Sequence, residues 1–155
     1  MQPAMSPGMR RVMVAIAVLA CAGIVVSSIS LYHHYGSSKT SFCDFGNSFS
    51  CDVVNRSIYS SVFGIPVALI GILGYALVLG LATIYRAKSE TPISLLIASV
   101  AGLGFAIYLT YIEGFVLGVW CILCLSSLGC IVGITALSST LAARSMWQAA
   151  APDRD

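Results

Sequence analysis

The chain has 155 residues, of which 58% are hydrophobic and only 9% are charged, and its mean hydropathy is +0.93. Soluble domains carry about 25% charged residues, so this composition excludes an ordinary soluble domain and indicates an integral membrane protein. The net charge of +2 is small, and no basic stripe or nucleic-acid motif is present, so no nucleic-acid partner is expected.

Four apolar segments follow one another along the chain, and each is about 20 residues long. A helix of that length crosses the ~30 Å hydrocarbon core of a bilayer. Pro66 falls in the first turns of the second segment, where its missing N–H costs least. We therefore expect one all-α integral membrane domain over residues 1–155. It is a bundle of four transmembrane helices, at about 12–32, 62–85, 93–112 and 121–143, with an outer loop at 33–61.

Two further features bear on this bundle. The first apolar run continues past Cys21 to Leu31, which is longer than a typical signal-peptide core, so a retained helix is expected. Small residues recur at helix-packing spacing, as Gly129 with Gly133 and as Ala98 with Gly102. Small residues let membrane helices approach closely, so a compact bundle is expected.

Lysine and arginine residues are distributed unequally between the segments. Six of the eight lie before the first segment, between the second and third, or after the fourth, whereas only Lys39 and Arg56 lie in the outer loop. The positive-inside rule then places both termini in the cytoplasm and the loop outside. We expect a multi-pass protein of the bacterial cytoplasmic (inner) membrane, with its outer loop in the periplasm, where disulfides persist.

The six cysteines divide into two groups. Two lie inside apolar segments, where a cysteine is usually a small buried hydrophobe: Cys21 and Cys130. The other four all fall on the outer side of the membrane, two in the loop and two in the "WCILC" motif that opens the fourth segment: Cys43, Cys51, Cys121 and Cys124.

The CxxC motif has a direct chemical consequence at this position. A helix N-terminus favours negative charge, so the pKa of a thiol placed there is expected to fall and its thiolate to become more reactive. Cys121 is expected at the mouth of the helix near water. Cys124, one turn further, is expected to point toward the apolar bundle.

Metal binding and inert disulfides are the alternative interpretations of these cysteines. The spacing is not a familiar zinc pattern, and His33 and His34 fall at the membrane boundary, where they are expected to act as interfacial anchors or loop contacts. Two inert disulfides would explain the loop pair. They explain the CxxC poorly, because a four-residue redox loop adds little rigidity to a helix already fixed by the membrane. Redox chemistry is therefore favoured.

The pattern as a whole resembles the vitamin K epoxide reductase family, and its bacterial members in particular. The resemblance covers about 12–144. It rests on the Cys-x7-Cys loop pair, Ser57 six positions later, the Ser-x-Phe-Gly stretch at 61–64 and the CxxC. It implies a four-helix bundle around a quinone, ubiquinone or menaquinone, with the outer loop as a cap.

The resemblance also implies roles for individual residues. Cys43 would exchange with the thiols of a thioredoxin-fold partner, Cys51 would shuttle between Cys43 and Cys121, and Cys124 would face the quinone. The residues expected at the quinone are Ser57, Ser60, Ser61, Phe63, Cys124 and Leu128. Arg56 is an additional candidate, with a plain solvent-facing charge as its equal alternative.

Two departures from the family pattern favour a bacterial role. Ser60 and Leu128 stand where the vertebrate enzymes carry an asparagine and a tyrosine, which weakens the case for recognition of vitamin K epoxide. The expected function is quinone-dependent oxidation of a DsbA-like periplasmic partner, in support of disulfide bond formation. The chain ends 12 residues after position 143, so we expect no fused thioredoxin domain and a separate partner protein.

Two alternatives stay open at this point. One is a vitamin K epoxide or quinone reductase driven by a dithiol partner. The other is a protein without catalytic activity, either metal-binding or a scaffold with a disulfide-stapled loop. No acidic residue is expected to act in the chemistry. Glu113 is expected to mark a membrane boundary, and Asp44 and Asp52 are expected to be solvated loop acids.

Overall fold

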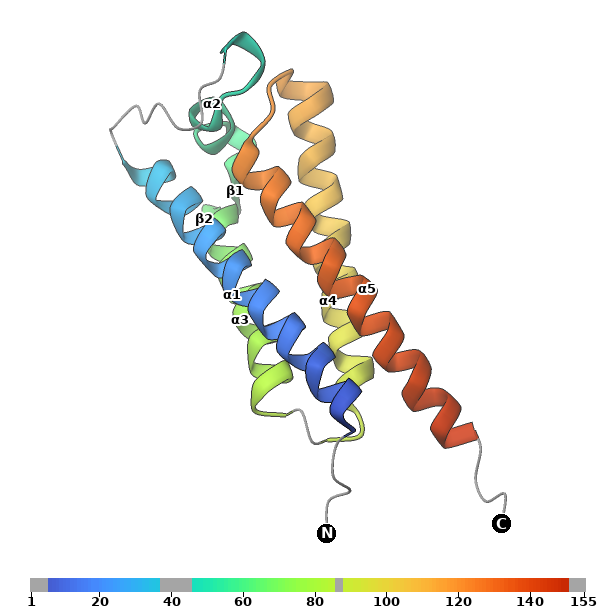
Figure 1. Ribbon diagram of the computed structural model, residues 1–155. Coiled ribbons are helices and arrows are strands. Elements are labelled where there is room, and N and C mark those ends of the chain that lie inside the picture. Colours follow the sequence, from blue (N-terminus) through green and yellow to red (C-terminus); the bar gives the residue numbers. More distant parts are fainter. Residues whose placement is uncertain (1–5, 37–45, 86–87, 151–155) are drawn as a thin grey trace, which may run out of the picture.

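The computed structural model describes residues 6–36, 46–85 and 88–150 (Figure 1). Four long helices pack side by side in this part of the chain. They are α1 (Pro7–Tyr35), α3 (Val67–Thr83), α4 (Thr91–Tyr111), which continues into the π-helix η3 (Ile112–Leu117), and α5 (Ile122–Ala150). Short elements connect α1 to α3. These are η1 (Gly46–Ser48), α2 (Cys51–Asn55), η2 (Ile58–Ser60), β1 (Ser61–Val62) and β2 (Ile65–Pro66).

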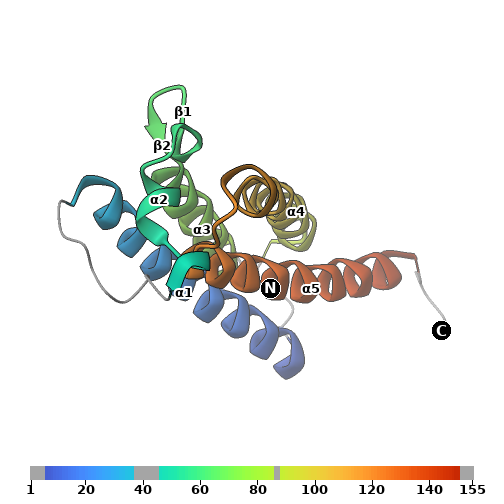
Figure 2. The same ribbon diagram turned by 90° about the horizontal axis from the view of Figure 1, so that it is seen from above.

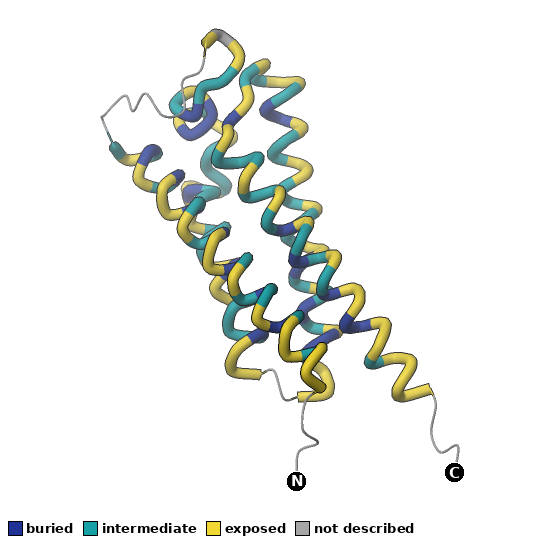
Figure 3. The backbone as a smooth tube through the Cα atoms, in the orientation of Figure 1, coloured by how far each residue is buried: buried dark blue, intermediate teal, exposed yellow. Residues whose placement is uncertain are grey.

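Within the described part of the chain, three stretches of helix are long and apolar enough to cross a membrane: Pro7–Tyr35, Thr91–Leu117 and Ile122–Ala150. Helix α3 is also apolar, but its 17 residues make it shorter than these three stretches. The outward faces of the helices carry exposed aliphatic side chains, such as Val18 and Leu73, and Figure 3 shows the buried positions facing inward. An apolar exterior of this kind is suited to lipid, so the chain is a membrane protein with mostly helical structure.

The second apolar segment becomes helical later than the expected residue 62. Residues 61–66 instead form a hairpin in which β1 pairs antiparallel with β2, Val62 opposite Ile65. The two residues between them, Phe63 and Gly64, have φ angles of 51° and 81°. Two consecutive positive φ angles suit a tight two-residue hairpin turn. The helix therefore starts only at Val67, directly after Pro66.

The core lies along the middle of the bundle, where small residues allow close contact. A Cβ atom added to Gly23 of α1 would lie 2.4 Å from the ring of Tyr75, so the ring packs directly on the α1 backbone. The Tyr75 hydroxyl donates a hydrogen bond to the Ser127 carbonyl at 2.7 Å. This one side chain therefore links α1, α3 and α5.

The small-residue pairs identified in the sequence are used unequally. Gly102 of α4 packs against Ile131 and Gly133 of α5 packs against Leu19, whereas Gly129 has open space beside it. The α4–α5 and α1–α5 contacts therefore use one glycine from each pair.

The two ends of the bundle differ. The start of α1, the α3–α4 connection and the end of α5 lie together at one end, and α2 lies at the other (Figure 1). Seen from above, α2 lies over the bundle, beside the start of α5 (Figure 2). This end of the molecule holds the cysteines described next.

Candidate active site

A short parallel β-bridge joins the segment before α2 to the segment before α5. Phe49 pairs with Trp120. The Trp120 N–H donates to the Ser48 carbonyl at 3.0 Å, and the Ser50 N–H donates to the Trp120 carbonyl at 3.1 Å. Cys51 lies two residues after Phe49 and Cys121 directly follows Trp120, so the bridge brings these two cysteines together.

The sulfur atoms of Cys51 and Cys121 lie 3.4 Å apart. A disulfide bond is about 2.05 Å long, so the two sulfurs are in non-bonded contact, at a distance from which exchange needs only a small movement. Both residues are fully buried. They share a small apolar cluster with Val54, and this cluster excludes water from the sulfur pair.

Cys121 differs from its sequence-based expectation. It was expected near water with a lowered pKa, but α2 covers it and its exposed fraction is 0%. The pKa of the Cys121 thiol is raised, chiefly by its hydrogen bond with Cys124 and further by burial, although the contact with Cys51 acts in the opposite direction. The expectation of a water-exposed, acidified thiol is therefore wrong, because packing outweighs the effect of the helix end.

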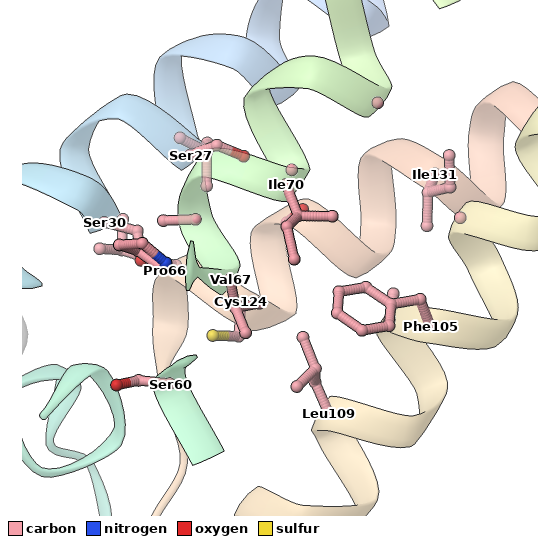
Figure 4. Close-up of a pocket in the computed structure, with 18 of the residues that line it drawn as sticks. Ser27, Ser30, Ser60, Pro66, Val67, Ile70, Phe105, Leu109, Cys124 and Ile131 are labelled. Carbon is pink, nitrogen blue, oxygen red and sulfur yellow. The ribbon is translucent and has the colours of Figure 1, made fainter. Parts of the chain in front are cut away.

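Cys124 lines a cavity of about 410 Å³ between the helices. Figure 4 shows its sulfur among the lining side chains, in keeping with the expectation that Cys124 points into the bundle. Most of the lining is apolar and comes from α3, α4 and α5, including Val67, Ile70, Phe105, Leu109 and Ile131. The outer end is lined by the segment between α2 and β1, including Tyr59 and Ser60.

The polar part of the lining is centred on Asn55 of α2. The Ser30 hydroxyl of α1 donates to Asn55 Oδ1 at 2.7 Å, and His34 Nδ1 donates to the Asn55 carbonyl at 2.5 Å. These two bonds hold Asn55 against α1. Its Nδ2 group is buried and has no hydrogen-bond partner among the described residues, and Asn55 itself lines the cavity.

These features fit a quinone. An apolar cavity suits a ring with a hydrocarbon tail, and an unused amide donor suits a ring carbonyl oxygen, since buried donors normally find an acceptor. The thiol of Cys124 lies on the same lining. The cavity therefore combines an apolar binding volume, a hydrogen-bond donor and a cysteine thiol.

The residues that the sequence placed at the quinone are distributed unevenly. Ser57, Ser60 and Cys124 line the cavity, whereas Ser61, Phe63 and Leu128 do not. The Ser57 hydroxyl donates to the Val54 carbonyl and the Ser60 hydroxyl to the Ser57 carbonyl, so both serine protons are already in use. Phe63, in the hairpin turn, is fully exposed.

Asp52, Arg56, Cys21 and Cys130 are not part of the cavity lining, and two further loop residues lie outside the described residues. Arg56 pairs with Asp52 at 2.9 Å and donates to the Gly36 carbonyl at 2.6 Å, so it ties α2 to the end of α1 and Asp52 is not simply solvated. Cys21 is exposed and Cys130 is half-buried. Cys43 and Asp44 lie outside the described residues.

Glu113 is a site residue that sequence reasoning missed, because it is expected there only to mark the membrane boundary. Its exposed fraction is 2%, and its Oε2 accepts a hydrogen bond from the Cys121 backbone N–H at 3.1 Å. It lies on the cavity lining. The available signal was an acidic residue inside an apolar segment, eight positions before the CxxC.

Within residues 6–36, 46–85 and 88–150, no group of three or more His, Cys, Asp or Glu side chains is placed to hold a metal ion.

Comparisons with known proteins bear on the chemistry of this site. The sequence matches none of the curated proteins. The model of the Vitamin K epoxide reductase family matches residues 14–139, and this confirms the resemblance found in the sequence. The chain therefore belongs to the vitamin K epoxide reductase family, and membership implies a membrane oxidoreductase that acts on thiols, disulfides and quinones.

Proposed function

We propose that this protein is a quinone-dependent thiol–disulfide oxidoreductase that reoxidises a separate thioredoxin-fold, DsbA-like partner. Electrons would pass from the loop cysteines Cys43 and Cys51 to the Cys121–Cys124 pair and then to a quinone. The observation that carries this proposal is the 3.4 Å contact between the Cys51 and Cys121 sulfurs. It joins the loop to the CxxC, as an electron relay requires.

The relay consists of thiol–disulfide exchanges. The partner's thiolate attacks the Cys43–Cys51 disulfide at Cys43, which frees Cys51. The Cys51 thiolate then attacks Cys121 of the Cys121–Cys124 disulfide, and Cys124 leaves with the electron pair. The partner's second thiolate then releases Cys43, and the Cys43 thiolate attacks Cys51 and releases Cys121, so that the Cys121–Cys124 pair is left as a dithiol. Each exchange breaks one disulfide bond and forms one. The contact of Cys51 with Cys121 supports the assignment of Cys51 as the cysteine that carries electrons inward, whereas the assignment of Cys43 rests on the family resemblance.

Cys124 and Asn55 are the residues best suited to act at the quinone. Bound quinone supplies a two-electron, two-proton acceptor that reoxidises the Cys121–Cys124 dithiol. Asn55 offers its unused Nδ2 donor, held in place by Ser30 at Oδ1. The segment from Val54 to Ser60 closes the outer end of the cavity and would keep water away from the thiol of Cys124.

The proposed placement in the membrane follows from charge and helix packing. The end of the bundle opposite α2 holds the start of α1, the α3–α4 connection and the last turns of α5 (Figure 1). These parts carry the basic residues Arg10, Arg11, Lys88 and Arg144. The positive-inside rule supports a cytoplasmic location for that end. Helix α3, packed between α1 and α4, would be the fourth membrane-spanning helix. The sulfur pair would then face the periplasm of a bacterial inner membrane.

A Cys124→Ala variant tests the relay. Membranes carrying the wild-type protein are expected to reoxidise a reduced thioredoxin-fold dithiol protein when quinone is present, and the variant is expected to lose this activity. Cys130→Ala, which removes a half-buried cysteine of the same helix, serves as the control and should retain it. Full activity in Cys124→Ala would contradict the relay.

A separate assay addresses the epoxide alternative. The proposed function predicts slow or no turnover of vitamin K epoxide by purified protein with a dithiol. The Leu128 side chain packs in the apolar core and the Ser60 hydroxyl donates to the chain itself, so neither supplies the polar groups found there in the vertebrate enzymes. Rapid epoxide turnover would favour the reductase alternative.

A further inference from the structure

Glu113 is a buried acid at the junction of the cysteine pair and the cavity. Its Oε2 accepts the Cys121 N–H, while its Oε1 is buried without a hydrogen-bond partner among the described residues. An ionised carboxylate with an unpaired oxygen is costly in an apolar setting. Acidic residues within membrane-spanning segments commonly mark sites of proton transfer.

The groups around this carboxyl are all part of the redox site. The Cys124 thiol lies close enough to interact with the carboxyl electrostatically and is close to Cys51 as well. No ion pair of the described residues involves Glu113, and the Arg56 and Asp52 side chains of α2 pair with each other. The titratable groups next to Glu113 are therefore Cys121 and Cys124. Cys51 interacts with Cys124 in turn, and His34 of α1 lies on the same cavity lining as Glu113.

Local structure fixes the carboxyl in this position. Glu113 lies in the π-helix η3, and short π-helical segments within α-helices frequently occur at functional sites. The next residue, Gly114, packs against the Trp120 indole so closely that an added Cβ would lie 2.9 Å from it. The π-helix and the segment that carries Cys121 are thereby held together, with the carboxyl between Cys121 and Cys124.

Building on the proposed function, we propose that Glu113 is the proton-transfer residue of the Cys121–Cys124 pair. When the Cys51 thiolate attacks Cys121, the Cys51–Cys121 bond forms and the Cys121–Cys124 bond breaks. The electron pair of the broken bond stays on Cys124, and the Glu113 carboxyl gives its proton to that sulfur. The products are a Cys51–Cys121 disulfide, a Cys124 thiol and a Glu113 carboxylate, so charge and protons balance.

The carboxylate formed in this step takes the proton back when Cys124 next loses it. The Cys124 thiol must be deprotonated before the Cys121–Cys124 disulfide closes again, because the thiolate is the reactive form. The carboxylate that lies beside it on the cavity lining can accept that proton without exposing the cavity to water. Glu113 therefore alternates between its two protonation states once per catalytic cycle.

The test uses the full-length oxidised protein in detergent with no added quinone, so that its readout does not depend on acceptor chemistry. Dithiothreitol reduces the protein, and rapid alkylation followed by mass spectrometry measures the rate at which the Cys124 thiol is formed. Glu113→Gln retains an oxygen acceptor for the Cys121 N–H but carries no transferable proton. Glu113→Asp retains the proton, and Glu90→Gln removes the exposed carboxylate before α4 as a matched control.

The expected result is a rate about 100-fold lower for Glu113→Gln, which is the lower end of what a positioned proton donor contributes. This variant should also lose the pH dependence and the solvent deuterium isotope effect of the wild type. Glu113→Asp should retain the isotope effect and show a pH dependence that is shifted from that of the wild type, with an intermediate rate. Glu90→Gln should match the wild type. Thermal unfolding checks that each variant is folded.

Two outcomes would overturn the inference and leave the proposed function intact. One is an unchanged rate in Glu113→Gln. The other is a lower rate with the wild-type pH profile and isotope effect, which would indicate a purely structural role. If Glu113→Gln does not fold, the Glu113→Asp profile decides, because a proton-transfer role requires its pH dependence to shift with the carboxyl. Failure of the wild type itself to pass electrons from Cys51 to Cys121 would instead overturn the proposed function.

Discussion

The sulfur atoms of Cys51 and Cys121 are in contact at 3.4 Å although 70 residues separate them in the chain. The Phe49–Trp120 bridge explains this proximity, because Cys51 lies two residues after Phe49 and Cys121 directly follows Trp120. In the proposed relay, this contact marks the step at which the loop and the CxxC would exchange electrons.

The first prediction is a specific crosslink. In a Cys43→Ser, Cys124→Ser double variant, Cys51 and Cys121 lose their expected disulfide partners. They should join in a disulfide bond under mild oxidation, because the required movement is small. Mass spectrometry of non-reduced peptides detects the bond. Cys21 and Cys130 should remain open to alkylation, and recovery of Cys51 and Cys121 as alkylated thiols would contradict the geometry.

A second prediction concerns Gly114. An alanine there would place its Cβ 2.9 Å from the Trp120 ring. Overpacking of this kind typically costs about 1 to 3 kcal/mol. Gly114→Ala should therefore displace Trp120, weaken the Phe49–Trp120 bridge and slow formation of the Cys51–Cys121 crosslink.

Gly104→Ala provides the matched control for Gly114→Ala, since Gly104 also lies in the α4 region but has no atom within 4 Å of an added Cβ. It should leave the crosslinking rate and the Trp fluorescence spectrum unchanged. Equal crosslinking rates for both glycine variants would show that the Trp120 contact does not position Cys121.

The third prediction concerns the contact between α1 and α3. Gly23→Ala would place a Cβ 2.4 Å from the Tyr75 ring. The ring has little freedom to move, because its hydroxyl is bonded to Ser127. The variant should lower the unfolding temperature in detergent, with a loss of about 1 to 3 kcal/mol. Gly80→Ala, in open space on α3, should not, and equal unfolding temperatures for the two variants would contradict the packing.

A fourth prediction follows from the raised pKa of Cys121. The folded protein keeps this thiol protonated, whereas the unfolded chain loses the proton near the ordinary cysteine pKa of about 8.5. Above that pH the unfolded state binds fewer protons than the folded state, so the free energy of unfolding of the reduced protein falls as pH rises. One such group contributes at most about 1.4 kcal/mol per pH unit.

Thermal unfolding of the reduced protein at several pH values measures this slope. Cys121→Ser, which removes the titrating group, should show a smaller loss of stability at alkaline pH than the wild type. An identical slope in the two proteins would mean that the pKa of Cys121 is not raised by folding.

Much of the fold could be predicted from the sequence, because hydropathy and cysteine spacing are local signals. The long apolar segments correspond to helices, and the family was identified from the cysteine, serine and glycine pattern. The start of α3 could not be placed correctly, since the apolar run at 62–66 conceals a hairpin. Only the positive φ angles of Phe63 and Gly64 reveal that turn.

The candidate site was harder to predict because it depends on contacts between distant segments. Cys121 is buried because α2 packs over it, and no local pattern indicates that packing. Asn55 appears in the sequence as an ordinary polar residue, and its importance comes from Ser30 and His34 on α1, which engage its Oδ1 and its carbonyl. The sequence predicts only a membrane boundary at Glu113, because it does not show that the Glu113 carboxyl accepts a hydrogen bond from the Cys121 N–H.

Anaerobic thiol titration tests the central claim most directly. Fully reduced protein is mixed with ubiquinone or menaquinone in the absence of oxygen, and the remaining thiols are identified by alkylation and mass spectrometry. We expect the wild type to lose the thiols of Cys43, Cys51, Cys121 and Cys124 and to keep those of Cys21 and Cys130. The Cys124→Ala variant should keep all five of its cysteine thiols in the reduced state. Retention of every thiol by the wild type with both quinones would contradict the account.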